Sequence, residues 1–364
     1  QGKGANVNLC LLGNKAAGFF RRLVAVGDFF ADKNATGGVG VFRHQTGEAG
    51  WRHVMADRPA YCVSVCAGNS ARVLVGTRSG VVLSDDGGLS FRPAHHAAPP
   101  RAIWSLTQDP HQPARWYAGA SPAAIYRSDD HGESWDLLAE PTIPDRAPMP
   151  FPPRVLRITV HPRRARELVA ALEIAGVLRS TDGGRHWHDC SDPLIALADG
   201  HPELQSRIVC DLGAEGMLDG HAVCASEAWP DAVLLACRMG IFRSDDGGSQ
   251  WRNLQLNRFS DFSYGRDVRV SPHDPSMLYA CLSVASNSKN GALMRSLDFG
   301  ETWQRFDKVQ PHGTLMAVSP HPTDRKQVYV AARYGEVFGT RDEGDSWFEL
   351  PLSGIQHVYG MACG

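Results

Sequence analysis

One short phrase recurs along this chain and constrains its fold more than any other feature. In its clearest copy, an apolar and aromatic run at residues 241–242 leads to Ser244-x-Asp246-x-Gly248 and then to Trp251. An Asp carboxylate can accept hydrogen bonds from backbone N–H groups of its own turn, and Gly adopts backbone conformations that other residues disfavour. The phrase therefore predicts a β-hairpin whose second strand begins near the aromatic residue.

Six copies of the phrase are well preserved, and a seventh is decayed. The six begin at Ser84, Ser128, Ser180, Ser244, Ser296 and Thr340, and end at Phe91, Trp135, Trp187, Trp251, Trp303 and Trp347. In the seventh, Phe42-Arg43-His44 leads to Trp51, with Thr46 and Glu48 in place of the Asp and the Gly. Seven copies in 364 residues give about 52 residues per repeat, which is typical of a propeller blade.

The repeat predicts an all-β fold, a seven-bladed β-propeller with four strands in each blade. We expect one propeller domain over residues 1–364, with a large loop insertion at 189–220. In the best-defined repeat, alternating apolar residues predict strands at 102–107, 115–119, 125–128 and 135–138. The first repeat lacks an inner strand before residues 23–26, whereas 357–362 form a strand with no repeat after it. We expect this last strand to complete the first blade, which removes an open sheet edge.

Composition excludes several classes of protein. A net charge of −2 gives no reason to expect nucleic acid or an anionic membrane as a partner, and no apolar run approaches the length of a membrane span. The nine Cys residues show no Cys-x-x-Cys spacing and are typical of small buried apolar residues, which favours a reducing, cytoplasmic location. Because the chain begins with Gln1, a mature secreted form remains an alternative. The oligomeric state is not predicted.

Three long connections are expected on one rim of the propeller. Residues 140–153, 189–220 and 254–267 each join an outer strand to the next inner strand, and therefore lie opposite the Asp-containing turns. Within the second connection, residues 193–198 could form a short helix. Long loops on one rim of a rigid scaffold commonly carry function.

Arginine residues are predicted to gather on that same rim. When the repeats are aligned on their third strands, the loops that precede those strands place four residues at matching positions near the mouth of the central pore. They are Arg78, Arg238, Arg333 and Glu173. Inner strands also begin there, which adds Arg101, Trp104, His221, Tyr264, Arg266, Asp267, His357 and Tyr359 as neighbours. Arg presents a planar fork suited to carboxylate or phosphate, so this pattern predicts a site for a small anionic molecule.

The expected ligand-binding residues include most of these side chains. They are Arg78, Arg101, Trp104, Arg238, Arg266, Arg333, Tyr334 and His357. In the alternative interpretation, the arginines pair with acids or lie in solvent.

Candidate catalytic residues come from the insertion and its neighbours. The run Asp211-x-x-x-Glu215-x-x-x-Asp219-x-His221 supplies carboxylates and an imidazole that could act as acid and base. With Glu173 and Tyr264 added, the expected catalytic set is Glu173, Asp219, His221 and Tyr264. These carboxylates could also hold a divalent cation, but the spacing matches no metal motif, so no metal residues are assigned. A solvated acidic loop is the alternative. No organic cofactor is predicted.

The recurring phrase resembles the Asp-box, or BNR, repeat of sialidases, xyloglucanases, sortilin-type receptors and photosystem II assembly factor-like proteins. The whole chain is similar to bacterial single-propeller proteins of the BNR-repeat glycosyl hydrolase, sialidase-like kind. This resemblance implies a propeller and a structural role for the Asp of each repeat. Sialidases carry a Phe-Arg-Ile-Pro signature, whereas Phe42-Arg43-His44 lacks the Ile-Pro. Xyloglucanases of the superfamily place paired acids between two propellers, and one propeller is expected here.

Two functions follow from these patterns. The first is a hydrolase or lyase that acts on a small carboxylate-bearing substrate, such as a uronate, at the pore-mouth face. The second is a non-catalytic binding or assembly propeller, similar to the photosystem II assembly factor class. A pocket closed over by the long loops would favour the enzyme, and a flat rim would favour the binding module.

Overall fold

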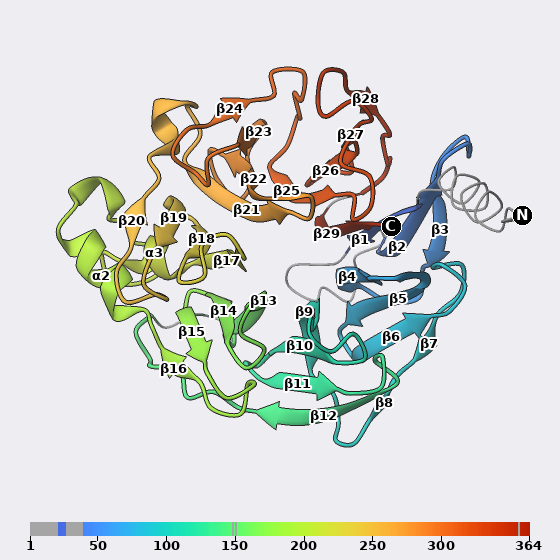
Figure 1. Cartoon of the computed structure of the whole chain (residues 1–364), viewed down its shortest axis with the longest axis horizontal. Helices are drawn as coiled ribbons and strands as arrows, with labels where there is room; N and C mark the ends of the chain where they lie inside the picture. Colours follow the sequence, from blue (N-terminus) through green and yellow to red (C-terminus); the bar gives the residue numbers. More distant parts are fainter. Residues whose placement is uncertain (1–20, 27–38, 148, 150, 356) are drawn as a thin grey trace, which may run out of the picture.

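The computed structural model describes residues 21–26, 39–147, 149, 151–355 and 357–364. Seven β-sheets stand around one central axis, with the inner strand of each sheet beside the axis (Figure 1). Six sheets have four strands, and the seventh gains a fifth, short strand at its outer edge. The predicted seven-bladed β-propeller is therefore confirmed. No helix among the described residues is long and apolar enough to cross a membrane.

Within each blade, the strands follow one another from the central axis outward. Blade 1 comprises β29 (Val358–Cys363), β1 (Arg21–Val26), β2 (Gly40–Gln45) and β3 (Arg52–Met55). Blade 2 comprises β4 (Ala60–Cys66), β5 (Asn69–Thr77), β6 (Gly80–Ser84) and β7 (Arg92–Pro93). Blade 3 comprises β9 (Ala102–Gln108), β10 (Trp116–Ser121), β11 (Ile125–Ser128), β12 (Ser134–Ala139) and the added β8 (His95–His96). Blade 4 comprises β13 (Arg154–Val160), β14 (Leu168–Glu173), β15 (Gly176–Ser180) and β16 (His188–Asp189).

The remaining blades follow the same plan. Blade 5 comprises β17 (Gly220–Ala225), β18 (Val233–Cys237), β19 (Gly240–Ser244) and β20 (Arg252–Asn253). Blade 6 comprises β21 (Tyr264–Ser271), β22 (Asp274–Ser283), β23 (Gly291–Ser296) and β24 (Gln304–Arg305). Blade 7 comprises β25 (Leu315–Pro320), β26 (Val328–Ala332), β27 (Val337–Thr340) and β28 (Phe348–Glu349). The insertion after blade 4 holds α2 (Asp192–Asp199), where a short helix was expected, and α3 (Glu215–Leu218). Single 3-10 turns occupy Pro202–Leu204 and Leu256–Arg258.

The C-terminal strand closes the ring, as the sequence predicts. β29 pairs antiparallel with β1, with Leu23 opposite Ala362. The amide of Arg21 donates to the carbonyl of Gly364 at 3.0 Å, and the Gly364 amide donates back at 3.2 Å. Figure 1 shows β29 beside β1 with the chain end nearby. This pairing satisfies backbone groups that would otherwise form an open edge.

Apolar packing between neighbouring blades holds the ring together. The described residues form seven buried clusters, and each cluster draws its members from two adjacent blades. In the cluster between blades 7 and 1, Tyr329 of β26 and Val358 of β29 are fully buried. Each blade therefore packs on its two neighbours, and the last interface exists only because the ring is closed.

The Ser-x-Asp-x-Gly turns have the hydrogen bonding that their residues predict. In blade 6, the Ser296 hydroxyl donates to Asp298 Oδ1 at 2.8 Å and accepts the N–H of Gly300 at 2.8 Å. Asp298 also accepts the N–H of Thr302 at 2.9 Å, and the indole of Trp303 donates to the Gly300 carbonyl at 3.1 Å. The Ser or Thr to Asp bond recurs in the other five turns.

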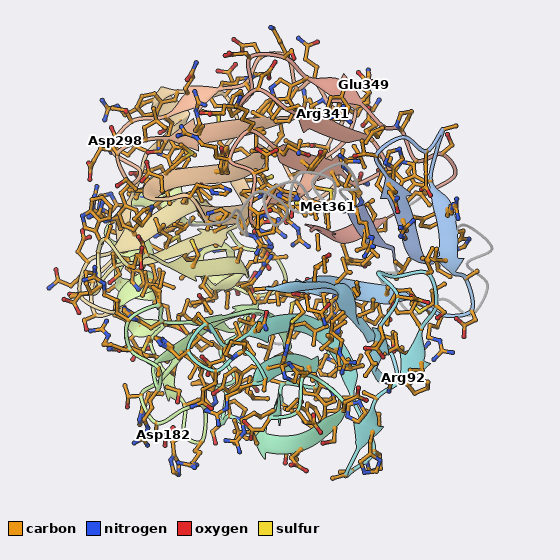
Figure 2. All side chains as sticks on the ribbon, turned by 45° about the vertical axis from the view of Figure 1, so that its right-hand side comes forward. Arg92, Asp182, Asp298, Arg341, Glu349 and Met361 are labelled. Carbon is orange, nitrogen blue, oxygen red and sulfur yellow. The ribbon has the colours of Figure 1, made fainter. Side chains whose placement is uncertain are left out.

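Two of these turn carboxylates can be located relative to the central axis. Asp182 and Asp298 are at the outer edge of the disc in Figure 2, whereas Met361 is near its centre. Hydrogen bonds from Ser346 and Thr340 lower the pKa of Asp342 to about 2, so that this carboxylate stays ionised as an acceptor for its own turn. Their bonding is local, which agrees with a structural role.

Replacing Ser296 with Ala is expected to lower the free energy of unfolding by about 1–3 kcal/mol, because the Gly300 N–H loses its acceptor in a buried turn. Urea unfolding followed by tryptophan fluorescence measures this change. Ser79→Ala, at an exposed position, is the matched control. Equal stability of the two variants would show that the turn contributes nothing to the fold.

Candidate functional site

A cavity of about 350 Å³ opens at the mouth of the central pore, on the rim opposite the Asp-containing turns. We call it the mouth cavity. It is lined by Trp104, Met149, Phe151, Arg154, Leu156, Glu173, Ile174, Ile208, Asp219, His221, Arg238, Tyr264, Arg266, Ser286, Met316, Arg333, His357 and Tyr359. Nine of the twelve side chains expected at this site are among them.

Three expected residues lie outside this lining. Arg101 donates to the carbonyl of Pro122 at 3.2 Å and pairs with Glu140, which holds it on the outer part of the rim. Arg78 lies on the exposed turn between β5 and β6. Tyr334 is 42% exposed, and its hydroxyl bonds to Asn287. Their positions in the repeat match those of cavity residues, but these side chains bond to local partners or are exposed to solvent, and so lie outside the cavity lining.

Arg154 is the main cavity residue that the sequence analysis missed. It is buried at the start of β13, directly after the Pro-rich connection. Its guanidinium lies 4.4 Å from the ring centroid of Trp104 and 4.2 Å from that of Phe151. The sequence pattern could have identified Arg154, because it lies at the start of its inner strand much as the predicted residue Arg101 lies just before β9.

Arg154 and Glu173 form a buried ion pair across the start of blade 4. Arg154 Nη1 lies 2.9 Å from Glu173 Oε2, and the two side chains are only 8% and 12% exposed. Burial raises the pKa of Glu173, the Arg154 charge opposes this shift, and the negative charge of Asp219 adds to it. A carboxyl whose pKa is raised can hold a proton closer to neutral pH and release it to a bound molecule.

A second polar chain joins blades 5 and 6. The ring nitrogen Nδ1 of His221 lies 2.6 Å from the Gly265 carbonyl, which can only accept, so Nδ1 carries a hydrogen. Nε2 is then the atom that gains or loses a proton, and it lies 3.1 Å from the Tyr264 hydroxyl and 3.5 Å from Asp219 Oδ2. Tyr264, His221 and Asp219 therefore form one connected polar chain in the cavity lining.

Asp219 is kept ionised although it is buried. Burial favours its protonated form, but His221 and the guanidinium of Arg238, whose Nε lies 3.1 Å from Oδ2, together lower the pKa of Asp219. The environments of Glu173 and Asp219 thus move their pKa values in opposite directions. A pair of carboxyl groups with separated pKa values is a common basis for acid and base roles.

The alternative interpretation, a solvated acidic loop, is wrong for Glu215 and Asp219. Both side chains are buried, and Glu215 accepts backbone N–H groups of Ile208, of Val209 at 2.8 Å and of Cys210 at 2.7 Å. Glu215 therefore anchors the loop that brings Ile208 to the cavity. In the described part of the chain, no three His, Cys, Asp or Glu side chains converge as metal ligands.

The charges lining the mouth cavity do not balance. Four arginines (Arg154, Arg238, Arg266 and Arg333) face two carboxylates, those of Glu173 and Asp219. The imidazole of His357 adds no charge, because burial and the neighbouring Arg333, Arg266 and Arg154 lower its pKa to about 2. Its Nδ1 accepts from Arg333 Nη2 at 3.0 Å. The lining therefore carries two excess positive charges when both carboxylates are ionised.

Several hydrogen-bond donors in the cavity have no protein acceptor. Among the residues that the structure describes, none forms a hydrogen bond or ion pair with the guanidinium of Arg266. The indole nitrogen of Trp104 and the hydroxyl of Tyr359 are buried, and within the same ranges neither has a partner. Buried polar atoms normally have partners, so these three groups can receive an acceptor from a bound molecule.

Comparison with known proteins supports the fold and leaves the function open. No protein-family model matches the chain. Vacuolar protein sorting/targeting protein 10 from Ajellomyces capsulatus is 35% identical over 66 residues, and its counterpart from Aspergillus oryzae is 32% identical over 87 residues. These stretches cover 18% and 22% of this chain, but only 4% and 6% of those proteins. The chain thus spans a small part of the curated relatives it matches.

Solved structures with a similar fold belong to different functional classes. The GH74 xyloglucanase from Xanthomonas campestris has a TM-score of 0.60 at 16% identity, over 91% of this chain and 46% of that one. YCF48 from Cyanidioschyzon merolae has a TM-score of 0.52 at 12% identity, over 82% of this chain and 88% of that one. At such identities the likeness shows the propeller fold alone, and both functional classes remain compatible with it.

Replacing Glu173 with Gln is expected to change how stability depends on pH. Because the folded pKa of Glu173 is raised, its stabilising contribution is complete below the unfolded value and is lost as pH rises through the folded value. Above about pH 4.3, the unfolding free energy of wild type should therefore fall relative to that of Glu173→Gln, which has no carboxyl to titrate at this position. The relative loss is at most about 1.4 kcal/mol per pH unit. Denaturant unfolding at a series of pH values measures this slope.

Glu227→Gln, at an exposed carboxylate, serves as the control for this measurement. A slope of the opposite sign in Glu173→Gln would mean that the folded protein favours the ionised carboxylate. The role of Glu173 as a proton donor would then be untenable.

Proposed function

We propose that this protein binds a small carboxylate-bearing molecule in the mouth cavity and catalyses its hydrolysis or elimination. The observation that carries the proposal is the guanidinium of Arg266, which forms no hydrogen bond or ion pair with the described residues and stands in a cavity with at least two excess positive charges. A carboxylate would neutralise part of this charge and accept two parallel N–H bonds from one guanidinium. A uronate is a substrate of this class.

The walls of the cavity suit the rest of such a ligand. Tyr359 stacks on His357 with ring centroids 4.2 Å apart and meets Trp104 edge-on at 5.4 Å. These rings supply an apolar surface, while the Tyr359 hydroxyl and the Trp104 indole can bond to hydroxyl groups of a sugar. In this proposal Arg266 and Arg333 hold the carboxylate, and the aromatic groups orient the ring.

Proton transfer is assigned to the two polar chains. Glu173, with its raised pKa, donates a proton to the leaving oxygen. Nε2 of His221, whose tautomer is fixed by the Gly265 carbonyl, accepts a proton directly or through the Tyr264 hydroxyl. Asp219 stabilises the imidazolium that results. Removal of a proton next to the carboxylate gives elimination, and activation of a water gives hydrolysis.

A non-catalytic binding or assembly propeller is the second candidate. It is favoured by the resemblance of the repeats to Asp-box proteins and by the nearly whole-length match to YCF48, a single chain of similar extent. Against it stands the shape of the mouth. Met149, Phe151 and Ile208, from two of the long connections, line the cavity, which favours a small ligand over a flat protein surface.

Calorimetric titration with glucuronate, benzoate and phosphate tests the binding proposal. We expect the sugar acid to bind wild type, and Arg266→Met to weaken that binding by about 10- to 100-fold, as for loss of a hydrogen bond to a charged group. Arg78→Met is the matched control, because Arg78 holds a matching repeat position but lies on an exposed turn. Equal weakening in both variants, or no binding of any carboxylate, would contradict the proposal.

Turnover separates the enzyme from the binding module. With a carboxylate that binds and is converted, Glu173→Gln and His221→Ala should each lower kcat by about 10²- to 10⁴-fold, as loss of an acid or base does. Asp211→Asn, an exposed acid of the same insertion, should leave kcat unchanged. Unchanged kcat in both cavity variants would end the catalytic assignment and favour the binding module.

A further inference from the structure

Below the mouth cavity, the central pore narrows to a second cavity of about 60 Å³, which we call the axial cavity. The two cavities share the lining residues Trp104, Leu156, His221, Arg266, Met316 and Tyr359. On its other side, the axial cavity shares Val63, Leu106, Arg157, Arg269 and Met361 with a wider cavity that reaches the Asp-turn rim. Met361 lies near the centre of the disc in Figure 2. The axial cavity is thus the narrow middle of the pore.

Three arginines line the axial cavity; Arg266 also lines the mouth cavity, and the other two share one carboxylate. Arg157 comes from the inner strand β13 of blade 4, and Arg269 from the inner strand β21 of blade 6. Asp267 is fully buried, and its Oδ1 lies 3.4 Å from Arg157 Nη2 and 3.1 Å from Arg269 Nε. Its Oδ2 also accepts the N–H of Val318 at 3.2 Å. One carboxylate therefore compensates two guanidinium groups.

Much of the hydrogen-bonding capacity of these arginines is unused. Nε of Arg157 is buried and has no acceptor in the described part of the chain. Within the same residues, all bonds to Arg269 go through its Nε, so its terminal nitrogens have no protein acceptor. A guanidinium carries five N–H donors, and the Arg157 and Arg269 side chains are 24% and 33% exposed, so their unpaired donors are open to a small ligand in the pore.

No other nearby group among the described residues supplies the missing negative charge. Burial raises the pKa of the Cys62 and Cys224 thiols to about 12, so both are neutral at neutral pH. Burial and the Arg269 charge lower the pKa of Arg157 to about 10, which still leaves its guanidinium charged at neutral pH. Arg157, Arg269 and Asp267 therefore carry one unbalanced positive charge.

We propose that the axial cavity is a binding site for one small monovalent anion of the size of chloride, held by Arg157 and Arg269. A single negative charge balances the cluster, and the N–H groups of Arg157 and Arg269 can point at one ion from two sides. The volume is about that of two water molecules, which admits a halide but excludes a sugar acid. The bound ion would join blades 4 and 6 across the axis, and so stabilise the ring.

Bromide, which scatters anomalously, tests the site directly. Crystals grown without chloride and soaked in sodium bromide should show an anomalous difference peak in the axial cavity, in contact with Arg157 and Arg269. Arg157→Met crystals treated in the same way should lack this peak. Water alone in the wild-type axial cavity, with bromide bound only at the surface, would overturn the proposal.

Thermal unfolding in solution provides the second test. When chloride is replaced by methanesulfonate at constant ionic strength, the Tm of wild type should fall by about 2 °C, as expected for loss of a bound ion. Arg157→Met should show no chloride dependence, whereas Arg333→Met, altered only in the mouth cavity, should retain it. Asp267→Asn should also retain it, because removal of the carboxylate increases the positive charge. Loss of the chloride effect in Arg333→Met, or its persistence in Arg157→Met, would refute the site.

Discussion

The pairing of β29 with β1 is the constraint on which the rest of this structure depends. It joins the last described strand to the first, and it creates the buried cluster between blades 7 and 1. Because each blade packs only on its neighbours, an open ring would leave two sheet faces exposed to water. His357 and Tyr359 reach the mouth cavity from this same segment of chain. The same C-terminal segment therefore closes the ring and completes the lining of the candidate site.

The ring divides structural and chemical roles between its two rims. At the outer edge, each turn carboxylate is satisfied by the serine or threonine and the amides of its own hairpin. On the opposite rim, the starts of the inner strands bring Arg154, His221 and Arg266 from three blades to one cavity. Repetition makes the turns alike, whereas most residues of the site, such as Arg154, His221 and Arg266, differ from one blade to the next.

The sequence was sufficient to predict the fold because the turn chemistry is local and repeated. A Ser or Thr, an Asp and a Gly at fixed spacing determine a hairpin without information from the rest of the chain, and six such hairpins with one decayed copy determine the blade number. The closing strand was also predictable, since residues 357–362 had no other sheet to join.

The site, by contrast, was predictable only in outline. Repeat alignment placed Glu173, Arg238 and Arg333 on the correct rim, and all three line the mouth cavity. Repeat alignment wrongly placed Arg78 at the cavity, because the position of a residue in a repeat does not determine how exposed its turn is. The burial of Glu215 depends on amides that a loop supplies only after folding.

Whether the mouth cavity receives a carboxylate is tested most directly by a crystal structure of the protein with glucuronate. Electron density is expected in the mouth cavity, with the carboxylate within hydrogen-bond distance of the Arg266 guanidinium. The sugar ring should lie against Trp104 and Tyr359. A mouth cavity that holds only water at a saturating concentration of glucuronate, with Arg266 turned to a protein acceptor, would contradict carboxylate binding at this site.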